Sequence, residues 1–567
     1  MKKKNRNFWP ALIILLFVTL IAVKALFKPG FYTNHDGEHQ IVRLHQFHKL
    51  LNEGQIPVRW AGDLRNGYGY PLFIFSYRLP WYLGEPLLRL GFSLVNTIKA
   101  LFIIAMLLSA VFMFLWQKEL WGVWAGLLAS VLYIWAPYRF SVNLVRAALG
   151  EAFAIAFAPL LFYSLQRLAK AKDRRFIYIG ALAFTGMLLS HAITTWLYLP
   201  VVAGYTALLL VNLTKNQRLM LIKRISGLLA LGLGLSAFYW LPAGYGRRFI
   251  PALGAEFFVD HLLILKQLLY SPWGYTFSMP GVEQDGMSFQ AGIAQWLAVA
   301  AVLVSAVYFW LVKKSSRKPD QADNRLVAFF LLTFGFSIFL MVEPSRVVWK
   351  MFSQVVLIDY PWRLISISVL AASSLAGAVF KSWEKFRWPL AWSFFAGLLL
   401  VAFYTNRNHL KVNQYTFFPE SFYTENVGTS NSYDEYTPYW GRGDYLKTRR
   451  DILEFALKPG APQGQGRILN IDRPNSTQIE VDFEVTSPQA LMRLNSLYYP
   501  GWQLFLDDQV VKFDYQSSQG VMDFISPEGK HHLQAVFKET PLRLTADWLS
   551  VLSLLILVIG LWKQKYA

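Results

Sequence analysis

The sequence predicts a polytopic α-helical membrane protein with about twelve transmembrane helices and an extracytoplasmic β-sandwich near the C-terminus. Three observations predict this fold class. The 567 residues are 54% hydrophobic and only 16% charged, which is not the composition of a soluble globular chain. Apolar runs close to the about 20 residues that cross a bilayer recur along the chain. Residues 405–545 are more polar and contain short alternating segments.

The first apolar run, Phe8 to Phe27, follows a basic start and could be taken for a signal peptide. Phe27-Lys28-Pro29-Gly30 is a poor cleavage site, so we expect a retained helix. Eleven further segments of similar character follow at 98–116, 121–136, 150–168, 175–190, 195–213, 223–242, 291–312, 325–342, 364–380, 387–404 and 546–562.

Positive charge in the short loops predicts the topology. If the N-terminus is cytoplasmic, the cytoplasmic loops are the short basic ones, as the positive-inside rule requires: 167–175, 215–224, 313–325 and 381–387. Both termini are then cytoplasmic, in a plasma membrane. The long segments lie outside, at 29–97, 243–290, 343–363 and 405–545.

Composition excludes two classes of function. The chain has no cysteine, which removes disulfides, thiol nucleophiles and cysteine-ligated metals. Its formal charge of +20 lies largely in short loops, where topology and anionic lipid headgroups explain it. Membrane lipids are therefore expected partners, and nucleic acid is not.

We expect three parts: a transmembrane domain over 1–404, a β-sandwich over 405–545, and a last helix with a cytoplasmic tail over 546–567. Residues Gln478 to Val485 alternate strictly between polar and apolar, the period of a half-buried strand. A turn is expected at Pro527-Glu528-Gly529-Lys530. Further strand candidates are 465–471, 490–497, 502–506, 510–515, 520–525 and 531–537.

The first extracytoplasmic segment carries the densest polar chemistry, Asn34-His35-Asp36-Gly37-Glu38-His39. The spacing of apolar residues predicts a helix over 36–51, with Asp36, His39 and Arg43 on one face. The stretch 67–82 is aromatic and interrupted by prolines, which predicts an irregular loop on the bilayer surface.

Asp36 is the leading catalytic candidate, because charged groups at the membrane are costly and usually functional. The alternative is a helix N-cap, a position that aspartate favours. Glu38 is expected to face away from that site and to be solvated.

A second group contains Arg139, Arg146 and Glu151. Glu151 opens an apolar helix, where negative charge is favoured for purely structural reasons. Alternatively, Glu151 faces Asp36 across a cleft and Arg146 binds a phosphate bidentately.

Two further positions lie at outer helix ends. His191 is a structural residue or a ligand, and Arg363 snorkels to the headgroups or binds a lipid phosphate. No Walker loop, GxGxxG on a strand or HExxH motif is present, so ATP hydrolysis, dinucleotide chemistry and zinc proteolysis lack support.

In their order along the chain, these residues resemble the GT-C superfamily of polyprenol-phosphate-sugar-dependent glycosyltransferases. More narrowly, the chain is similar to bacterial and archaeal 6-pyruvoyl-tetrahydropterin-synthase-related membrane proteins, with kinship to YfhO-like proteins. That name implies no pterin chemistry, since no matching soluble enzyme core is visible. The resemblance is carried by His35-Asp36 with His39 and Arg43, Pro57–Trp60, Gly67–Pro71, Arg146–Glu151, Tyr360–Arg363, Glu435-Tyr436 with Pro438, and Tyr499–Trp502.

The resemblance implies a catalytic base at Asp36, a second acid at Glu151 and phosphate ligands at Arg146 and Arg363. Gly37 separates Asp36 from the next acid, unlike the adjacent acids of some GT-C members, so the need for a divalent cation is left open. Other expected substrate or phosphate contacts are His35, His39, Arg43, Arg139 and His191. Acceptor or sugar contacts are expected from Tyr68, Tyr70 and Tyr436.

The expected function is transfer of a sugar from a polyprenyl-phosphate donor to an extracytoplasmic acceptor, a cell-envelope glycan, lipid or protein. Two alternatives stay open. A lipid-linked-sugar transporter or flippase would need polar groups along a path through the membrane. A non-enzymatic envelope assembly factor would bind its partner through the sandwich.

Overall fold

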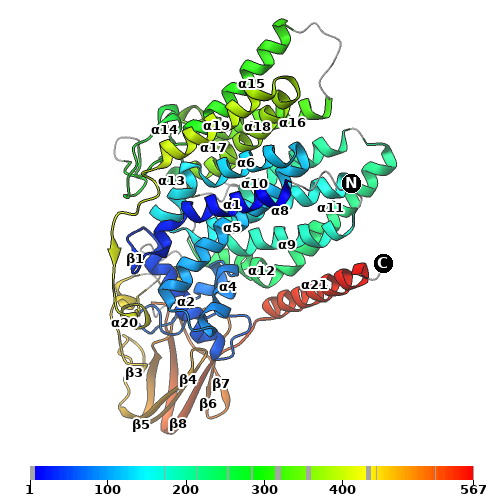
Figure 1. Ribbon diagram of the computed structural model, residues 1–567. Helices are drawn as coiled ribbons and strands as arrows, with labels where there is room; N and C mark the ends of the chain where they lie inside the picture. Colours follow the sequence, from blue (N-terminus) through cyan, green and yellow to red (C-terminus); the bar gives the residue numbers. More distant parts are fainter. Residues whose placement is uncertain are drawn as a thin grey trace.

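Helices make up most of the structure, a computed structural model (Figure 1). It describes residues 7–170, 173–211, 213–251, 255–281, 285–312, 321–352, 359–428, 436–441, 443–516 and 519–565. Each of the twelve predicted apolar segments overlaps a helix or a bent helix pair. These are α1 (Phe8–Ala22), α5 (Leu94–Trp121), α6 (Val123–Ile134), α8 (Leu149–Lys170), α9 (Arg175–Ser190), α10 (Ala192–Leu210), α11 (Lys215–Leu235) with α12 (Ala237–Gly246), α15 (Ile293–Val312), α16 (Gln321–Met341), α18 (Ile365–Phe386), α19 (Trp388–Asn406) and α21 (Pro541–Lys565).

Within the described residues, seven helices are long and apolar enough to cross a membrane: α5, α8, α10, α16, α18, α19 and α21. The pair α11 and α12, bent by 71°, meets the same test when taken together, and α1, α6, α9 and α15 are shorter apolar helices. A multi-pass membrane protein is therefore confirmed, and twelve crossings stay a prediction.

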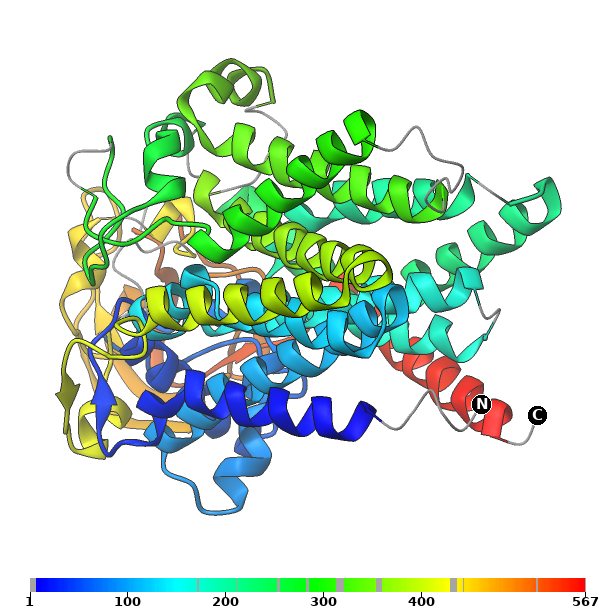
Figure 2. The ribbon, with the colours of Figure 1, turned by 45° about the horizontal axis from the view of Figure 1, so that its top comes forward.

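Burial ranks these helices from the centre of the bundle to its edge. In the most apolar stretch of α18, 94% of the residues are buried, whereas in that of α21 only 17% are buried. Helix α18 is thus enclosed by other helices, while α21 runs along the outside (Figure 1). The start of α1 and the end of α21 lie at the same end of the bundle (Figure 2). Which side of the membrane this end faces stays a prediction.

The first long segment folds largely as predicted. Helix α2 (Gly37–Asn52) buries Ile41, Leu44 and Phe47, the apolar stripe expected of a surface helix. The prediction of an irregular loop over 67–82 is partly wrong. Helix α3 (Leu72–Phe75) forms within this stretch, and α4 (Leu79–Arg89) begins in it and extends beyond it. Proline is tolerated in the first turn of a helix, so it does not prevent α4 from starting there.

A six-stranded antiparallel sheet follows the helices, with the order β3-β5-β8-β6-β7 and β4 paired to β5. The predicted alternation is confirmed, since Ile479, Val481, Phe483 and Val485 are all buried. The strands are β3 (Leu453–Phe455), β4 (Gly466–Asn475), β5 (Gln478–Leu494), β6 (Trp502–Leu506), β7 (Gln509–Val511) and β8 (Met522–Phe537).

The predicted turn at Pro527–Lys530 is wrong, because these residues lie inside β8. They pair with β5 on either side of a register shift between Val485 and Gln489. Such a bulge bends both strands and accommodates a proline in the ladder. The predicted sandwich is thus one continuous hydrogen-bonded sheet, whose two longest strands run through both halves.

The sheet shares its hydrophobic core with the first segment. Trp60 stacks on Phe537 with 5.1 Å between ring centroids and meets Trp502 edge-on at 5.6 Å. The short strand β1 (Phe31–Tyr32) pairs with β2 (Tyr415–Thr416), just after α19. The first segment therefore joins the helices to the sheet.

Helix α21 is fastened to that segment by the buried Arg59. Its Nε donates to Oε1 of Glu539 at 3.0 Å and its Nη2 to Oδ1 of Asp547 at 2.7 Å. Its Nη1 donates to the carbonyl oxygen of Phe238 in α12 at 2.6 Å. One guanidinium thus holds α12 and α21 against the first segment.

Candidate active site

Asp36 occupies the N-cap position of α2, but its side chain makes no capping hydrogen bond. The Oδ1 of Asn34 instead accepts the hydrogen bond from the Gly37 N–H at 2.5 Å. The Asp36 carboxylate is partly exposed, and it accepts no hydrogen bond from the residues that the structure describes. The capping alternative therefore does not account for this side chain.

The main chain beside Asp36 is bonded to the segment before α8. The N–H groups of His35 and Asp36 donate to the carbonyl oxygens of Val145 and Arg146, each at 3.0 Å. A π-helical turn, η3 (Ser141–Val145), precedes Arg146, and such turns occur frequently at functional sites. Ala147 has a φ of +51°, uncommon for a residue with a side chain. This geometry places Arg146 next to Asp36.

Glu151, in the first turn of α8, is 1% exposed. Its carboxylate accepts hydrogen bonds from the Tyr138 hydroxyl, from Nη1 of Arg363, and from Nη1 of Arg146 at 2.8 Å. Glu151 therefore does not face Asp36 across an open cleft, because these three donors enclose its carboxylate. A buried carboxylate of this kind holds its partners in position.

The two arginines at Glu151 differ in their remaining donors. Arg363, in η6 (Pro361–Leu364), also donates from Nε and Nη2 to the carboxylate of Asp359 at 2.6 and 2.5 Å. It is buried and fully engaged, so it does not snorkel to headgroups. The Arg146 guanidinium lies over the Trp362 ring at 4.5 Å. Its Nε and Nη2 donate to no residue that the structure describes.

The surroundings of His35 and His39 favour their neutral forms, because each pKa is lowered. Burial, and then the charge of Arg146, lowers the pKa of His35, whose Nε2 donates to the carbonyl oxygen of Tyr275 at 3.1 Å. Burial, and then Arg43, lowers the pKa of His39, while Asp36 opposes both effects. Asp36 at the N-cap of α2 and His39 and Arg43 within it follow one another at the spacing of one helix face.

His191 caps α10. Its Nδ1 accepts a hydrogen bond from the Thr194 N–H at 3.2 Å and lies 2.8 Å from the Thr194 hydroxyl. Burial, and then Arg363, lowers the pKa of His191 to about 4. His191 therefore acts as a helix cap, which is the structural one of its two predicted roles. It lies close enough to Glu151 and Arg363 for their charges to affect it.

Arg139, in α7 (Pro137–Phe140), points toward α5 rather than toward Asp36. Its Nη2 donates to the Ser109 hydroxyl at 2.5 Å, and its guanidinium lies 5.4 Å from the centre of the Tyr133 ring. Arg139 is 1% exposed. The structure therefore does not bring Arg139 together with Arg146 as a second phosphate ligand.

The three tyrosines expected to contact sugar are used in packing. The Tyr68 hydroxyl donates to the Thr448 carbonyl oxygen at 3.0 Å, and the Tyr70 hydroxyl accepts from the Tyr436 N–H at 3.0 Å. Tyr436 stacks on Phe75, and both Tyr68 and Tyr70 are at most 1% exposed. They are covered because the sheet closes over the first segment. Glu435 lies outside the described residues.

Two residues of the cluster had no predicted role. Tyr138 and Asp359 become neighbours of Glu151 and Arg363 only through tertiary contacts. The signal for Asp359 was its place four residues before Arg363, a spacing suited to an ion pair. Within the described ranges, no group of three or more His, Asp or Glu side chains is arranged to hold a metal ion.

Comparison with known proteins finds one family model that matches part of the chain. Residues 75–252 match the family model described as 6-pyruvoyl-tetrahydropterin synthase related domain, membrane protein. An uncharacterized protein of Lactococcus lactis subsp. cremoris (strain MG1363) is 24% identical over 249 residues, which are 42% of this chain and 40% of that protein.

Two solved structures are similar to this chain at low sequence identity. The arabinofuranosyltransferase AftD from Mycobacteria has a TM-score of 0.43 and 17% identity over 71% of this chain and 27% of that one. The Archaeoglobus fulgidus oligosaccharyltransferase, tethered with an acceptor peptide, has a TM-score of 0.42 and 12% identity over 74% and 56%. This chain thus spans less than two thirds of each relative, and TM-scores this low do not define an activity. The chain is a multi-pass membrane protein, and its residues 75–252 match the model of the 6-pyruvoyl-tetrahydropterin synthase-related membrane protein domain.

Proposed function

We propose that the protein is a membrane-embedded glycosyltransferase of the GT-C type. It would move a sugar from a polyprenyl-phosphate donor to an acceptor outside the cytoplasm. The acceptor would be a glycan, lipid or protein of the cell envelope. The single observation that carries this proposal is that Asp36 and Arg146 are joined through their main chains while both side chains keep polar atoms that no described residue engages. Asp36 accepts no hydrogen bond from the described residues, and Arg146, bonded to it through the main chain, keeps Nε and Nη2 available.

Asp36 supplies the base in this reaction. It accepts the proton of the acceptor hydroxyl while the oxygen attacks the anomeric carbon of the donor sugar, which inverts its configuration. The bond between the anomeric carbon and the phosphate oxygen breaks, and the phosphate leaves with the electron pair. A phosphate leaving group needs no proton from an acid, so one carboxylate suffices.

Arg146 stabilises the negative charge that develops on the departing phosphate. A guanidinium with two free donor nitrogens can hold two phosphate oxygens in its planar fork. Glu151 and Arg363 support this task indirectly, because they fix the position of the third Arg146 nitrogen. We assign them positioning roles.

The test replaces Asp36 with asparagine, a near-isostere that cannot accept the proton. The full-length protein, reconstituted in vesicles with a polyprenyl-phosphate sugar and envelope extract as acceptor, should lose about 100- to 10,000-fold in turnover. Glu38→Gln is the matched control, since this exposed acid lies two residues away in the first turn of α2. It should leave turnover unchanged.

Undiminished transfer by a well-folded Asp36→Asn variant would remove Asp36 from the mechanism. Movement of the lipid-linked sugar across the vesicle membrane without any transfer would instead favour the transporter. Loss of activity only from changes in the sheet, with Asp36 silent, would favour an assembly factor.

A further inference from the structure

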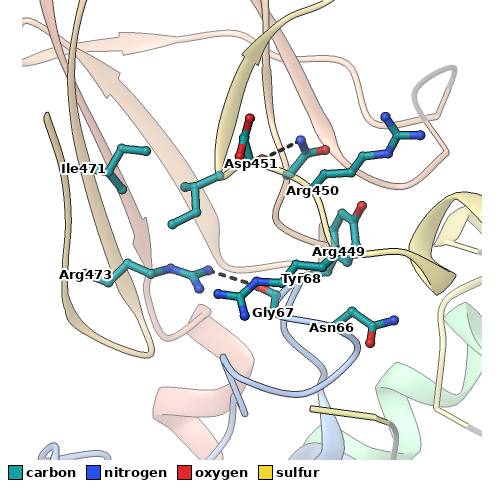
Figure 3. Close-up of a pocket in the computed structure, with 10 residues that line it drawn as sticks. Asn66, Gly67, Tyr68, Arg449, Arg450, Asp451, Ile471 and Arg473 are labelled. Atoms are coloured by element: carbon teal, nitrogen blue, oxygen red, sulfur yellow. Dashed lines mark hydrogen bonds between the residues drawn. The ribbon is translucent and has the colours of Figure 1, made fainter. Parts of the chain in front are cut away.

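A small cavity lies where the first segment meets the sheet. It has a volume of about 210 Å³ and is lined by Asn66–Tyr68, by 449–452 before β3, by β4, and by Asn495 (Figure 3). None of the residues around Asp36 and Glu151 lines it. Pockets for drug-sized ligands measure about 300–1,000 Å³. This cavity therefore suits a single charged group with the sugar that carries it.

Two guanidinium groups meet in this cavity. Arg473 donates from Nη2 to the carbonyl oxygen of Gly67 at 3.1 Å, and Arg449 also lines the cavity (Figure 3). Both arginine side chains are exposed to solvent. In the part of the chain that the structure describes, no carboxylate accepts a hydrogen bond from either arginine. Two like charges are thus held together without a counter-ion bonded to them.

The nearby acids do not neutralise this pair. The carboxylate of Asp451 is directed away from both guanidinium groups, and it is the main-chain carbonyl of Asp451 that accepts from Asn495 at 2.7 Å (Figure 3). The carboxylate of Asp63 is bonded to the ammonium of Lys49. The guanidinium of Arg450 packs over the Tyr445 ring at 4.3 Å instead of adding to the pair. The cavity therefore presents an excess of positive charge.

We propose that this cavity binds an anionic group, a phosphate or a carboxylate, carried by a glycan. Arginine forks bind both groups through charge-assisted hydrogen bonds. Asn66 and Asn495 also line the cavity, and their amide nitrogens donate to the main-chain carbonyl oxygens of Leu446 and Asp451 at 3.0 and 2.7 Å. The cavity is lined by residues of β4 and of the segment before β3, and the sheet that contains these strands lies below the helical bundle in Figure 1, which favours a glycan over a lipid headgroup. That this glycan is the acceptor rests on the proposed function.

The experiment measures binding to the full-length protein in nanodiscs of phosphatidylcholine by calorimetry. The probes are tetragalacturonate, the uncharged maltotetraose, and inorganic phosphate as competitor. We expect tetragalacturonate to bind, phosphate to compete with it, and maltotetraose to bind at least tenfold more weakly. The double variant Arg449→Gln, Arg473→Gln should weaken tetragalacturonate binding at least tenfold. Because both side chains are exposed, this variant should unfold at the wild-type temperature.

The matched control is Arg467→Gln, on the same strand as Arg473 but paired with Glu484 at 2.9 Å. It should bind tetragalacturonate as the wild type does, and so should Asp36→Asn, whether or not it turns over. Equal binding by the double variant, or equal binding of maltotetraose, overturns the proposal. Loss of tetragalacturonate binding when phosphatidylglycerol is added to the nanodisc assigns the cavity to a lipid headgroup and overturns it as well.

Discussion

The main-chain N–H of Asp36 donates to the main-chain carbonyl of Arg146 across 3.0 Å. This bond fixes the start of α2 to the turn before α8, so the main chains of Asp36 and Arg146 are held side by side, while Glu151 and the Trp362 ring hold the Arg146 guanidinium. A site built on main-chain contacts keeps its geometry when a side chain is exchanged. Substitutions at either position should therefore report on chemistry and binding.

Arg146→Gln should weaken use of the donor while leaving the fold intact. Glu151 keeps Arg363 and Tyr138 as partners, so no buried charge is left alone. Loss of hydrogen bonds to a charged phosphate costs about 1.5–3 kcal/mol, which lowers kcat/KM for the donor about 10- to 100-fold. Steady-state kinetics with varied donor measures this. Arg407→Gln, an exposed arginine just after α19, is the control, and an equal loss there would contradict the assignment.

Arg363→Met should instead destabilise the protein. It leaves Asp359 without its arginine and removes one of the three donors to Glu151, both in a buried setting. Breaking a buried ion pair from one side costs about 3–5 kcal/mol. Thermal unfolding in detergent should show a much lower midpoint than for Arg146→Gln. Equal midpoints for the two variants would contradict the positioning role.

Protonation of His409 should make the folded protein less stable as the pH is lowered. Burial lowers the pKa of this residue to about 4, whereas in the unfolded chain it is about 6.5. Between these values the unfolded chain binds a proton that the folded chain does not, so stability is lost as pH falls from about 6.5 to 4. The loss reaches about 3 kcal/mol at most.

His409→Phe keeps the ring on Trp273, which lies 4.0 Å away, and should flatten the dependence of the unfolding midpoint on pH over this range. His532→Gln is the control. Its pKa is raised by a hydrogen bond with Asp482, so its contribution has the opposite sign. An unchanged slope in His409→Phe would show that other groups carry the effect.

Two glycines of the first segment offer a matched test of its packing against the sheet. Both have φ above +80°, but a Cβ on Gly69 would lie 2.4 Å from the Trp60 ring, whereas one on Gly67 would meet nothing within 4 Å. Gly67→Ala should cost about 1–2 kcal/mol of backbone strain. Gly69→Ala should cost about 1–3 kcal/mol more, because Trp60 must leave its stack. Thermal unfolding of both variants measures the difference, and equal midpoints would contradict the packing described.

Local patterns predicted the helices and part of the site, and tertiary contacts decided the rest. The face that Asp36 shares with His39 follows from helical spacing alone. The closure of Glu151 could not be predicted, because Arg363 reaches it across 212 residues of sequence. The turn signal at Pro527–Lys530 was overridden by pairing with β5. Tyr70 belongs to an aromatic stretch of the kind found at membrane interfaces. It is buried in the core only because the sheet covers it.

The attachment of Arg59 to Asp547 bears on how the chain is made. Synthesis delivers the first segment long before α21, yet the guanidinium of Arg59 lacks its carboxylates until Glu539 and Asp547 have emerged. During translation that positive charge must stay hydrated or be shielded by another protein. Helix α21 is thus needed to complete this contact, and a chain released before α21 is made would leave Arg59 of the first segment without its two carboxylate partners.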